Sequence, residues 1–161
     1  LKRRYFGTII MPLVDSNQKK LNLNDIVRIA AENTKSPYTK EQVMGALFKE
    51  LTMSGSIVIQ IGNTLFVVHR TKDDPTIGMM RAFNADTAQN YALNSEQFAD
   101  MAYNKYKIDT IVSDYTDPTI SNIFRFVGRN KPKNMGFKIG KLSDGKTFRA
   151  IAKLGPELGT N

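Results

Sequence analysis

Cysteine and tryptophan are absent from this chain of 161 residues, and histidine occurs once, as His69. Without cysteine there is no disulfide framework, no thiolate zinc site and no Cys–His catalytic pair. No apolar run approaches the roughly 20 residues that a membrane-spanning helix needs, and we expect no signal peptide. Internal repeats, low-complexity blocks and interdomain linkers are missing too. These absences predict one soluble, intracellular domain.

Acidic residues are scarce at the two ends of the chain, so the net charge of +8 is unevenly distributed. Residues 1–20 carry a net charge of +4 and residues 101–154 carry +7, whereas residues 21–100 carry −2. A basic surface attracts nucleic acid, phosphorylated ligands or acidic proteins. A basic surface also keeps a protein soluble without any partner, so the charge alone does not show whether the protein binds one.

Hydrophobic periodicity and turn residues predict an alternation of strands and helices. The predicted strands are residues 5–14, 57–61, 64–68, 76–83, 108–115, 135–142 and 146–154. The predicted helices are residues 22–33, 39–55, 94–105 and 117–128, with residues 84–93 irregular. The clearest local signal is the pair of β-branched runs around Gly62-Asn63, which predicts a tight hairpin. Both arms are apolar on both faces, so we expect the hairpin in the middle of the sheet, covered on both sides.

Local patterns predict where the helices begin and which side of them is buried. Asn22 is expected to cap the first helix, and Thr39 with Gln42 forms a capping box for the second. Asn94 is expected to cap the third helix. Asp117 followed by Pro118 predicts the start of the fourth. The expected buried stripe of the fourth helix is Ile120, Ile123, Phe124 and Val127, at the spacing of one helical face.

The spacing in the second half of the chain resembles one acetyltransferase family. Asp117, Ile120, Phe124 and Gly128 stand where GNAT-type N-acetyltransferases carry an Asn, a small residue, a Tyr and a Gly. The order of predicted elements is similar to the complete GNAT layout. The resemblance implies an α/β (α+β) fold with a mixed central sheet of about seven strands flanked by four helices. It also implies a single domain over residues 1–154, followed by a C-terminal tail over residues 155–161.

Two departures from the family pattern argue against acetyl transfer. In the family, a Gly-rich turn after the fourth strand holds the cofactor pyrophosphate on backbone amides at a helix N-terminus. The corresponding stretch, Arg81 to Leu93, has no glycine, and its side chains obstruct close approach of a phosphate. The candidate cofactor region is Arg81, Asn84, Ala85 and Asp86. The family's frequent general acid, a Tyr, is replaced by Phe124, which has no proton to donate.

Few other residues are candidates for chemistry. Asp114 ends the strand near the place where the family performs its chemistry, and Tyr115 beside it could supply the missing hydroxyl. His69 could be a general base, but a strand-end histidine without a catalytic role explains it better. Asp73 and Asp74 precede a proline and are better explained as a turn than as cation ligands, so no metal site is predicted.

Four basic residues near the end of the fourth helix form the best candidate binding patch. They are Arg125, Arg129, Lys131 and Lys133. Cations at a helix C-terminus are also favoured by the helix dipole, and the two interpretations have equal weight.

Three functions follow from these observations. The preferred hypothesis is a GNAT-fold protein that needs no cofactor and serves as a binding or assembly component with protein partners. Because the family has relatives inside tailed-phage particles, we expect it in the cytoplasm or within a virus particle, and not at a membrane. The alternative is an active N-acetyltransferase that uses acetyl-CoA through an atypical loop. The third is a basic nucleic-acid-binding module, which the uncharged tip of the hairpin disfavours.

Overall fold

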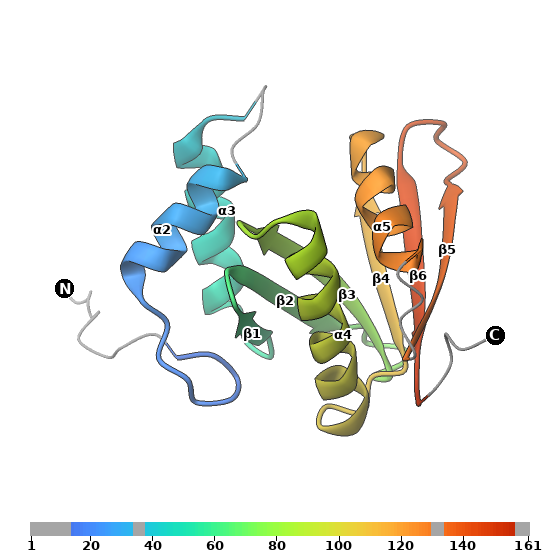
Figure 1. Ribbon diagram of the computed structural model, residues 1–161, viewed down its shortest axis with the longest axis horizontal. Coiled ribbons are helices and arrows are strands. Elements are labelled where there is room, and N and C mark those ends of the chain that lie inside the picture. The colour runs from blue at the N-terminus through green and yellow to red at the C-terminus, as the bar shows by residue number, and fades with distance from the viewer. Residues whose placement is uncertain (1–13, 34–37, 130–133, 157–161) are drawn as a thin grey trace.

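A computed structural model describes residues 14–33, 38–129 and 134–156 (Figure 1). Its strands are β1 (Ile57–Ile61), β2 (Thr64–Arg70), β3 (Ile77–Asn84), β4 (Thr110–Tyr115), β5 (Met135–Lys141) and β6 (Phe148–Leu154). Its helices are α2 (Leu23–Glu32), α3 (Lys40–Thr52), α4 (Ala88–Asn104) and α5 (Thr119–Arg129). The described part of the chain therefore contains six strands and four helices. The predicted strand over residues 5–14 lies almost wholly outside it, and Val14 makes only an isolated bridge to Lys20.

The six strands form one mixed sheet in the order β1-β2-β3-β4-β6-β5. All neighbours are antiparallel except β3 and β4, which run parallel. This parallel pairing is short, because it joins only Ile77–Met79 to Thr110–Val112. Beyond these three pairs the two strands diverge, so the sheet consists of a β1-β2-β3 half and a β4-β6-β5 half that meet along a narrow seam (Figure 1).

Helices cover the two faces of the sheet unequally. On one face α2 and α3 pack against β1, β2 and β3 around Leu47, Leu65 and Val67. On the other face α4 and α5 pack against both halves of the sheet around Phe66 and Phe98, whose rings stack with centroids 4.4 Å apart. Alternate residues of β1 and β2 belong to the two clusters, which is why both strands are apolar throughout.

The hairpin prediction is confirmed in its geometry, with one difference in its position. Gly62 and Asn63 join β1 to β2, and β2 is a buried inner strand. Strand β1 is the outermost strand described at its end of the sheet, yet Ile57, Val58 and Ile59 are buried. The segment before α2 covers the outer edge of β1, because the Ser16 amide donates to the Val58 carbonyl over 2.6 Å.

Local capping predicted two helix starts correctly. The Asn22 side chain accepts a hydrogen bond from the amide of Asn24 at the start of α2. At the start of α3, Thr39 and Gln42 form the complete predicted capping box. The first turn of α5 follows Asp117, whose carbonyl accepts from the Ile120 amide over 3.1 Å.

Helix α4 begins earlier than the sequence predicted. Its cap is Thr87, which accepts from the Asn90 amide, so residues 88–93 are helical rather than irregular. Asn94, the predicted cap, is a buried interior residue of the helix. Its amide group is hydrogen-bonded to groups outside the helix, which explains how a cap-type residue is accommodated there.

The buried stripe of α5 is also rotated from its predicted position. Ile123 was expected in the core but is 37% exposed. Phe124 and Val127 are buried as predicted and pack against the sheet, and the third buried residue of this side is Ser121.

Candidate functional site

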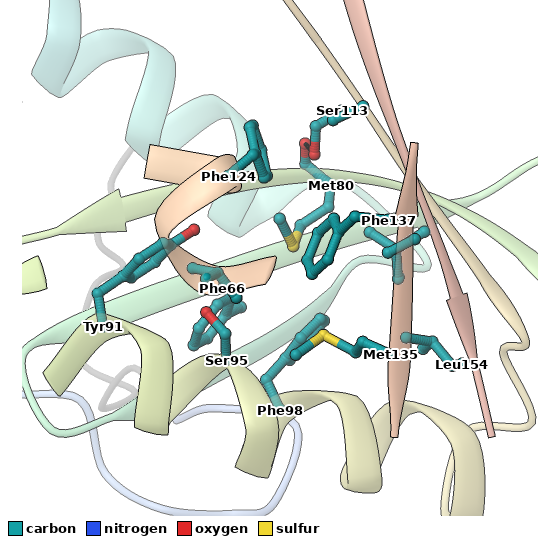
Figure 2. Close-up of a pocket in the computed structure, with 14 residues that line it drawn as sticks. Phe66, Met80, Tyr91, Ser95, Phe98, Ser113, Phe124, Met135, Phe137 and Leu154 are labelled. Atoms are coloured by element: carbon teal, nitrogen blue, oxygen red, sulfur yellow. Dashed lines mark hydrogen bonds between the residues drawn. The ribbon is translucent and has the colours of Figure 1, made fainter. Parts of the chain in front are cut away.

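An apolar pocket lies between α4, α5 and the sheet, where β3 and β4 diverge (Figure 2). Figure 2 shows Phe66, Met80, Phe124 and Phe137 pointing into it from the strands and α5, with Phe98 entering from α4. Its volume is about 30 Å³, which is room for one or two water molecules. The complete lining is Phe66, Met80, Tyr91, Ser95, Phe98, Ile111, Ser113, Phe124, Val127, Met135, Phe137, Ala150, Ala152 and Leu154.

Three hydroxyl groups reach this otherwise apolar pocket. The Ser113 hydroxyl donates to the Met80 carbonyl over 3.2 Å, which bridges β4 and β3 just beyond their last pair. Tyr91 and Ser95 enter from α4. Burial raises the pKa of Tyr91 to about 12, an effect that its hydrogen bond with Ser95 opposes. The Tyr91 hydroxyl therefore stays protonated at neutral pH and is not a base.

Asp86 anchors the loop between β3 and α4 to the tip of the β1–β2 hairpin. Its Oδ2 accepts hydrogen bonds from the Asn63 amide over 2.8 Å and from the Asn94 side-chain amide over 2.7 Å. The Thr64 hydroxyl lies 3.2 Å from the same oxygen. The Asp86 carboxylate, next to the start of α4, is therefore surrounded by donors from the hairpin turn, from β2 and from α4.

The hairpin tip fits closely around this carboxylate. Gly62 has a φ of +57°, and a Cβ built there would lie 3.1 Å from Asp86 Oδ2 and 3.2 Å from Asn94 Nδ2. Only glycine combines that backbone conformation with such a close approach. The closed loop therefore depends on the hairpin turn as well as on α4.

The remaining residues of the predicted cofactor region also interact inside the protein. Asn84 accepts from the Asp86 amide over 3.0 Å, and the Ala85 amide donates to the Asn63 carbonyl. Arg81 lies on the α3 side of the sheet, 3.2 Å from a carboxylate oxygen of Glu50. The four predicted residues are close in the chain but lie on two sides of the sheet: Arg81 and Ala85 face α2 and α3, whereas Asn84 and Asp86 bond to the hairpin at Thr64 and Asn63.

The two catalytic candidates point to opposite faces of β4. Asp114 receives two hydrogen bonds from Arg149, over 2.8 and 2.9 Å, on the side of β4 that faces away from α4 and α5. These bonds hold the pKa of Asp114 below its ordinary value. Tyr115 stacks on Phe124 of α5, and its hydroxyl lies 2.6 Å from the Ser121 hydroxyl. Asp114 and Tyr115 therefore cannot act on one reacting group.

The structure describes half of the predicted basic patch. Arg125 and Arg129 are exposed on α5, whereas Lys131 and Lys133 lie outside the described residues. Within residues 14–33, 38–129 and 134–156, neither arginine lies within ion-pair distance of a carboxylate.

His69 has no partner suited to catalysis. Its Nδ1 lies 3.3 Å from the Ser56 hydroxyl, which donates to the Glu50 carbonyl. Its Nε2 is buried and has no hydrogen-bond partner among the described residues. The same part of the chain contains no group of three or more side chains suited to hold a metal ion.

Sequence reasoning missed the pocket and the role of Asn94. The lining residues were recognised as apolar but are scattered over several strands and helices, and only the short β3–β4 pairing brings them around one space. A buried Asn opposite a hairpin tip leaves no local pattern in the sequence.

Comparisons with known proteins agree on the architecture. No family model and no curated protein matches the sequence. The Campylobacter jejuni N-acetyltransferase PseH is 13% identical, with 84% of this chain and 93% of that chain covered and a TM-score of 0.53. A protein from Bacillus halodurans is 8% identical, with 89% of both chains covered and a TM-score of 0.55.

A third solved structure is a chimera of Vibrio cholerae spermidine N-acetyltransferase SpeG with hSSAT. It is 10% identical, with 83% of this chain and 92% of that chain covered and a TM-score of 0.52. No helix in the described part of the chain is long and apolar enough to span a membrane. Element order, mixed sheet and covered lengths agree, and the chain therefore has the fold of the GNAT N-acetyltransferases.

Proposed function

We propose that this protein uses the GNAT fold as a binding or assembly component and does not transfer acetyl groups. The observation that carries the proposal is the Asp86 carboxylate beside the N-terminus of α4. By the resemblance to the GNAT family, this loop would hold a pyrophosphate. A carboxylate at this helix N-terminus repels a phosphate by its charge.

Two further observations support the proposal. The pocket between α4 and α5 is narrow, with a volume of about 30 Å³, and its lining is mostly apolar, so it offers few of the polar groups that orient a ligand. Phe124 is packed between the rings of Tyr115 and Phe137, so it serves the core rather than a reaction. Both observations support the proposal that this site does not take acetyl-CoA.

Thermal unfolding with and without acetyl-CoA tests this proposal. A ligand at a hundredfold excess over its dissociation constant stabilises a protein by about 2.7 kcal/mol. We expect no such stabilisation at millimolar acetyl-CoA, and we expect any small shift to vanish with added salt, as screened charge attraction does. A salt-resistant stabilisation by acetyl-CoA but not by ATP would overturn the proposal.

One observation favours the alternative, an active N-acetyltransferase. The pocket opens where β3 and β4 diverge. Tyr115 does not line it, but its ring stacks on Phe124, which does, so its hydroxyl is the nearby group that could donate a proton. If acetyl-CoA does bind, Tyr115→Phe should abolish transfer but not acetyl-CoA binding, while loss of the bond to the buried Ser121 hydroxyl lowers the melting temperature of the ligand-free protein by a few degrees. Asp114→Asn is the matched second substitution, since Asp114 faces away from this pocket.

The resemblance to proteins of tailed-phage particles extends the proposal to a place inside a virus particle. Antibody detection of the chain in purified particles, compared with the host cytoplasm, tests this extension. Absence from the particles would restrict the proposal to a cellular assembly.

A further inference from the structure

Strand β5 is an open edge of the sheet within the residues that the structure describes (Figure 1). It pairs with β6 on one side, over its whole length of seven residues. The opposite edge differs, because the Ser16 amide and hydroxyl bond to the backbone of Val58 along the outer side of β1. An uncovered edge offers a row of backbone donors and acceptors to another extended chain.

The hydrogen-bond register identifies the free groups. At the two ends of the β5–β6 hairpin, the Leu142 amide donates to the Thr147 carbonyl and the Gly155 amide donates to the Asn134 carbonyl. Bonded pairs alternate along an antiparallel ladder, so the even-numbered residues of β5 face β6. The backbone groups that point away from the sheet belong to Met135, Phe137, Ile139 and Lys141.

Strand β5 lacks most of the devices that prevent edge pairing. It has no proline, and every residue pairs with one residue of β6, so there is no bulge. Gly136 and Gly140 lie on the face of β5 that points away from α5. A Cβ added at either would meet no atom within 4 Å, so the side chains of an added strand have room on this face. Its only protection is Lys138 and Lys141, both exposed. Lysines on an edge repel a second copy of the same strand, but they attract an acidic one.

Helix α5 adds positive charge on the same side. A Cβ at Gly128 would lie 3.8 Å from the Phe137 ring, so this side of α5 lies against β5. Residues of a helix are about 100° apart, which places Arg125 and Arg129 next to Gly128 on the flank nearest β5. Neither α5 nor β5 contains an acidic residue. None of the four basic side chains pairs with a carboxylate within the described part of the chain.

We propose that the outer edge of β5 binds an extended acidic segment of a partner protein as a seventh strand of the described sheet. Backbone hydrogen bonds to Met135, Phe137, Ile139 and Lys141 provide the pairing, as in other cases of strand addition. Lys138 and Lys141 lie on opposite faces of β5, so each selects acidic side chains on one face of the added strand, and Arg125 and Arg129 add positive charge on the α5 face. This inference goes beyond the proposed function, since binding at this edge does not depend on whether acetyl-CoA binds.

Fluorescence anisotropy with a labelled nine-residue peptide of alternating Glu and Val tests the inference. We expect this peptide to bind, and we expect no binding by the Lys–Val counterpart or by the Glu–Val peptide N-methylated at every residue, which removes the amide donors of both of its edges. The double variant Lys138→Glu, Lys141→Glu should bind about tenfold or more weakly, since opposed charges become like charges. The control variant Lys40→Glu, Lys49→Glu makes the same change of net charge on α3 and should bind as the original protein does.

Amide NMR signals locate the binding independently of affinity. Addition of the Glu–Val peptide should slow hydrogen exchange at Met135, Phe137, Ile139 and Lys141. Absence of binding at about 1 mM peptide, equal binding of the N-methylated peptide, or equal loss in both double variants would overturn the inference. So would binding of a single-stranded oligonucleotide to these residues in place of the peptide.

Discussion

Asp86 shows how one carboxylate can both stabilise a loop and exclude a ligand. Asp86→Asn keeps the shape of the side chain but weakens the bonds from Asn63 and Asn94. Because hydrogen bonds to charged groups contribute about 1.5–3 kcal/mol, we expect the free energy of unfolding to fall by about 1–3 kcal/mol in urea denaturation. Asp73→Asn, on an exposed turn, is the control and should change it by less than about 0.5 kcal/mol. Equal effects would contradict this account of the loop.

The Asp114–Arg149 pair predicts a pH dependence of stability. The pair lowers the pKa of Asp114 below the ordinary value of 3.8 because Arg149 donates two hydrogen bonds to it. A folded-state pKa below the unfolded one means that the stabilisation is present above the unfolded value and is lost as the pH falls through the folded value. The pair is partly exposed, so we expect Asp114→Asn to cost at most about 1 kcal/mol at pH 7. Thermal melts should show this difference shrinking below pH 4, and a difference that grows in acid would refute the prediction.

At the scale of elements, α5 is held by a different set of residues from the one its spacing suggests. Val127→Ala should lower the free energy of unfolding by about 1.5–3 kcal/mol, since Val127 is buried in the main core. Ile123→Ala should cost less than about 1 kcal/mol, because Ile123 is 37% exposed. Chemical denaturation of both variants measures the difference, and the reverse order would show that α5 is rotated relative to the structure described.

Elements defined by local interactions were predictable from the sequence, whereas their contacts were not. The capping box of Thr39 and the Gly62-Asn63 turn involve neighbours in the chain, and the structure has both. Spacing in α5 indicated an amphipathic helix but could not fix the centre of its buried side, which includes Ser121 rather than Ile123. Asn94 resembled a cap because its preference for helix starts is local, while its bonds to Thr64 and Asp86 are tertiary.

The candidate site was predictable only in its chemistry. The glycine-free stretch Arg81 to Leu93 predicted that side chains obstruct a phosphate, which stays a prediction, and the structure adds that Asp86 bonds this loop to the hairpin tip. The separation of Asp114 from Tyr115 follows from strand alternation, which their sequence positions already implied. The pocket could not be predicted, because it depends on how far β3 and β4 stay paired.

On the scale of the whole molecule, the seam between the two halves of the sheet depends on Gly78. A Cβ at Gly78 would lie 2.5 Å from Val68 Cγ1, closer than atoms can approach, so Gly78→Ala must shift the Val68 side chain or the strands that carry the two residues. We expect it to cost about 1–3 kcal/mol of unfolding free energy, as overpacking does. Gly140→Ala is the matched control, since no atom lies within 4 Å of a Cβ there. Calorimetry on both variants gives the comparison, and a harmless Gly78→Ala would show that the seam tolerates expansion.

The shortness of that seam also determines how the molecule can deform. The three residue pairs between β3 and β4 resist a twist of one half against the other far less than the longer ladders within each half resist their own distortion. The two halves can therefore rotate against each other at the cost of few hydrogen bonds, while each half remains rigid. Such a rotation moves α5, which packs on β5 and β6, relative to β1 and β2, on which α4 mainly packs, and so changes the space between the two helices.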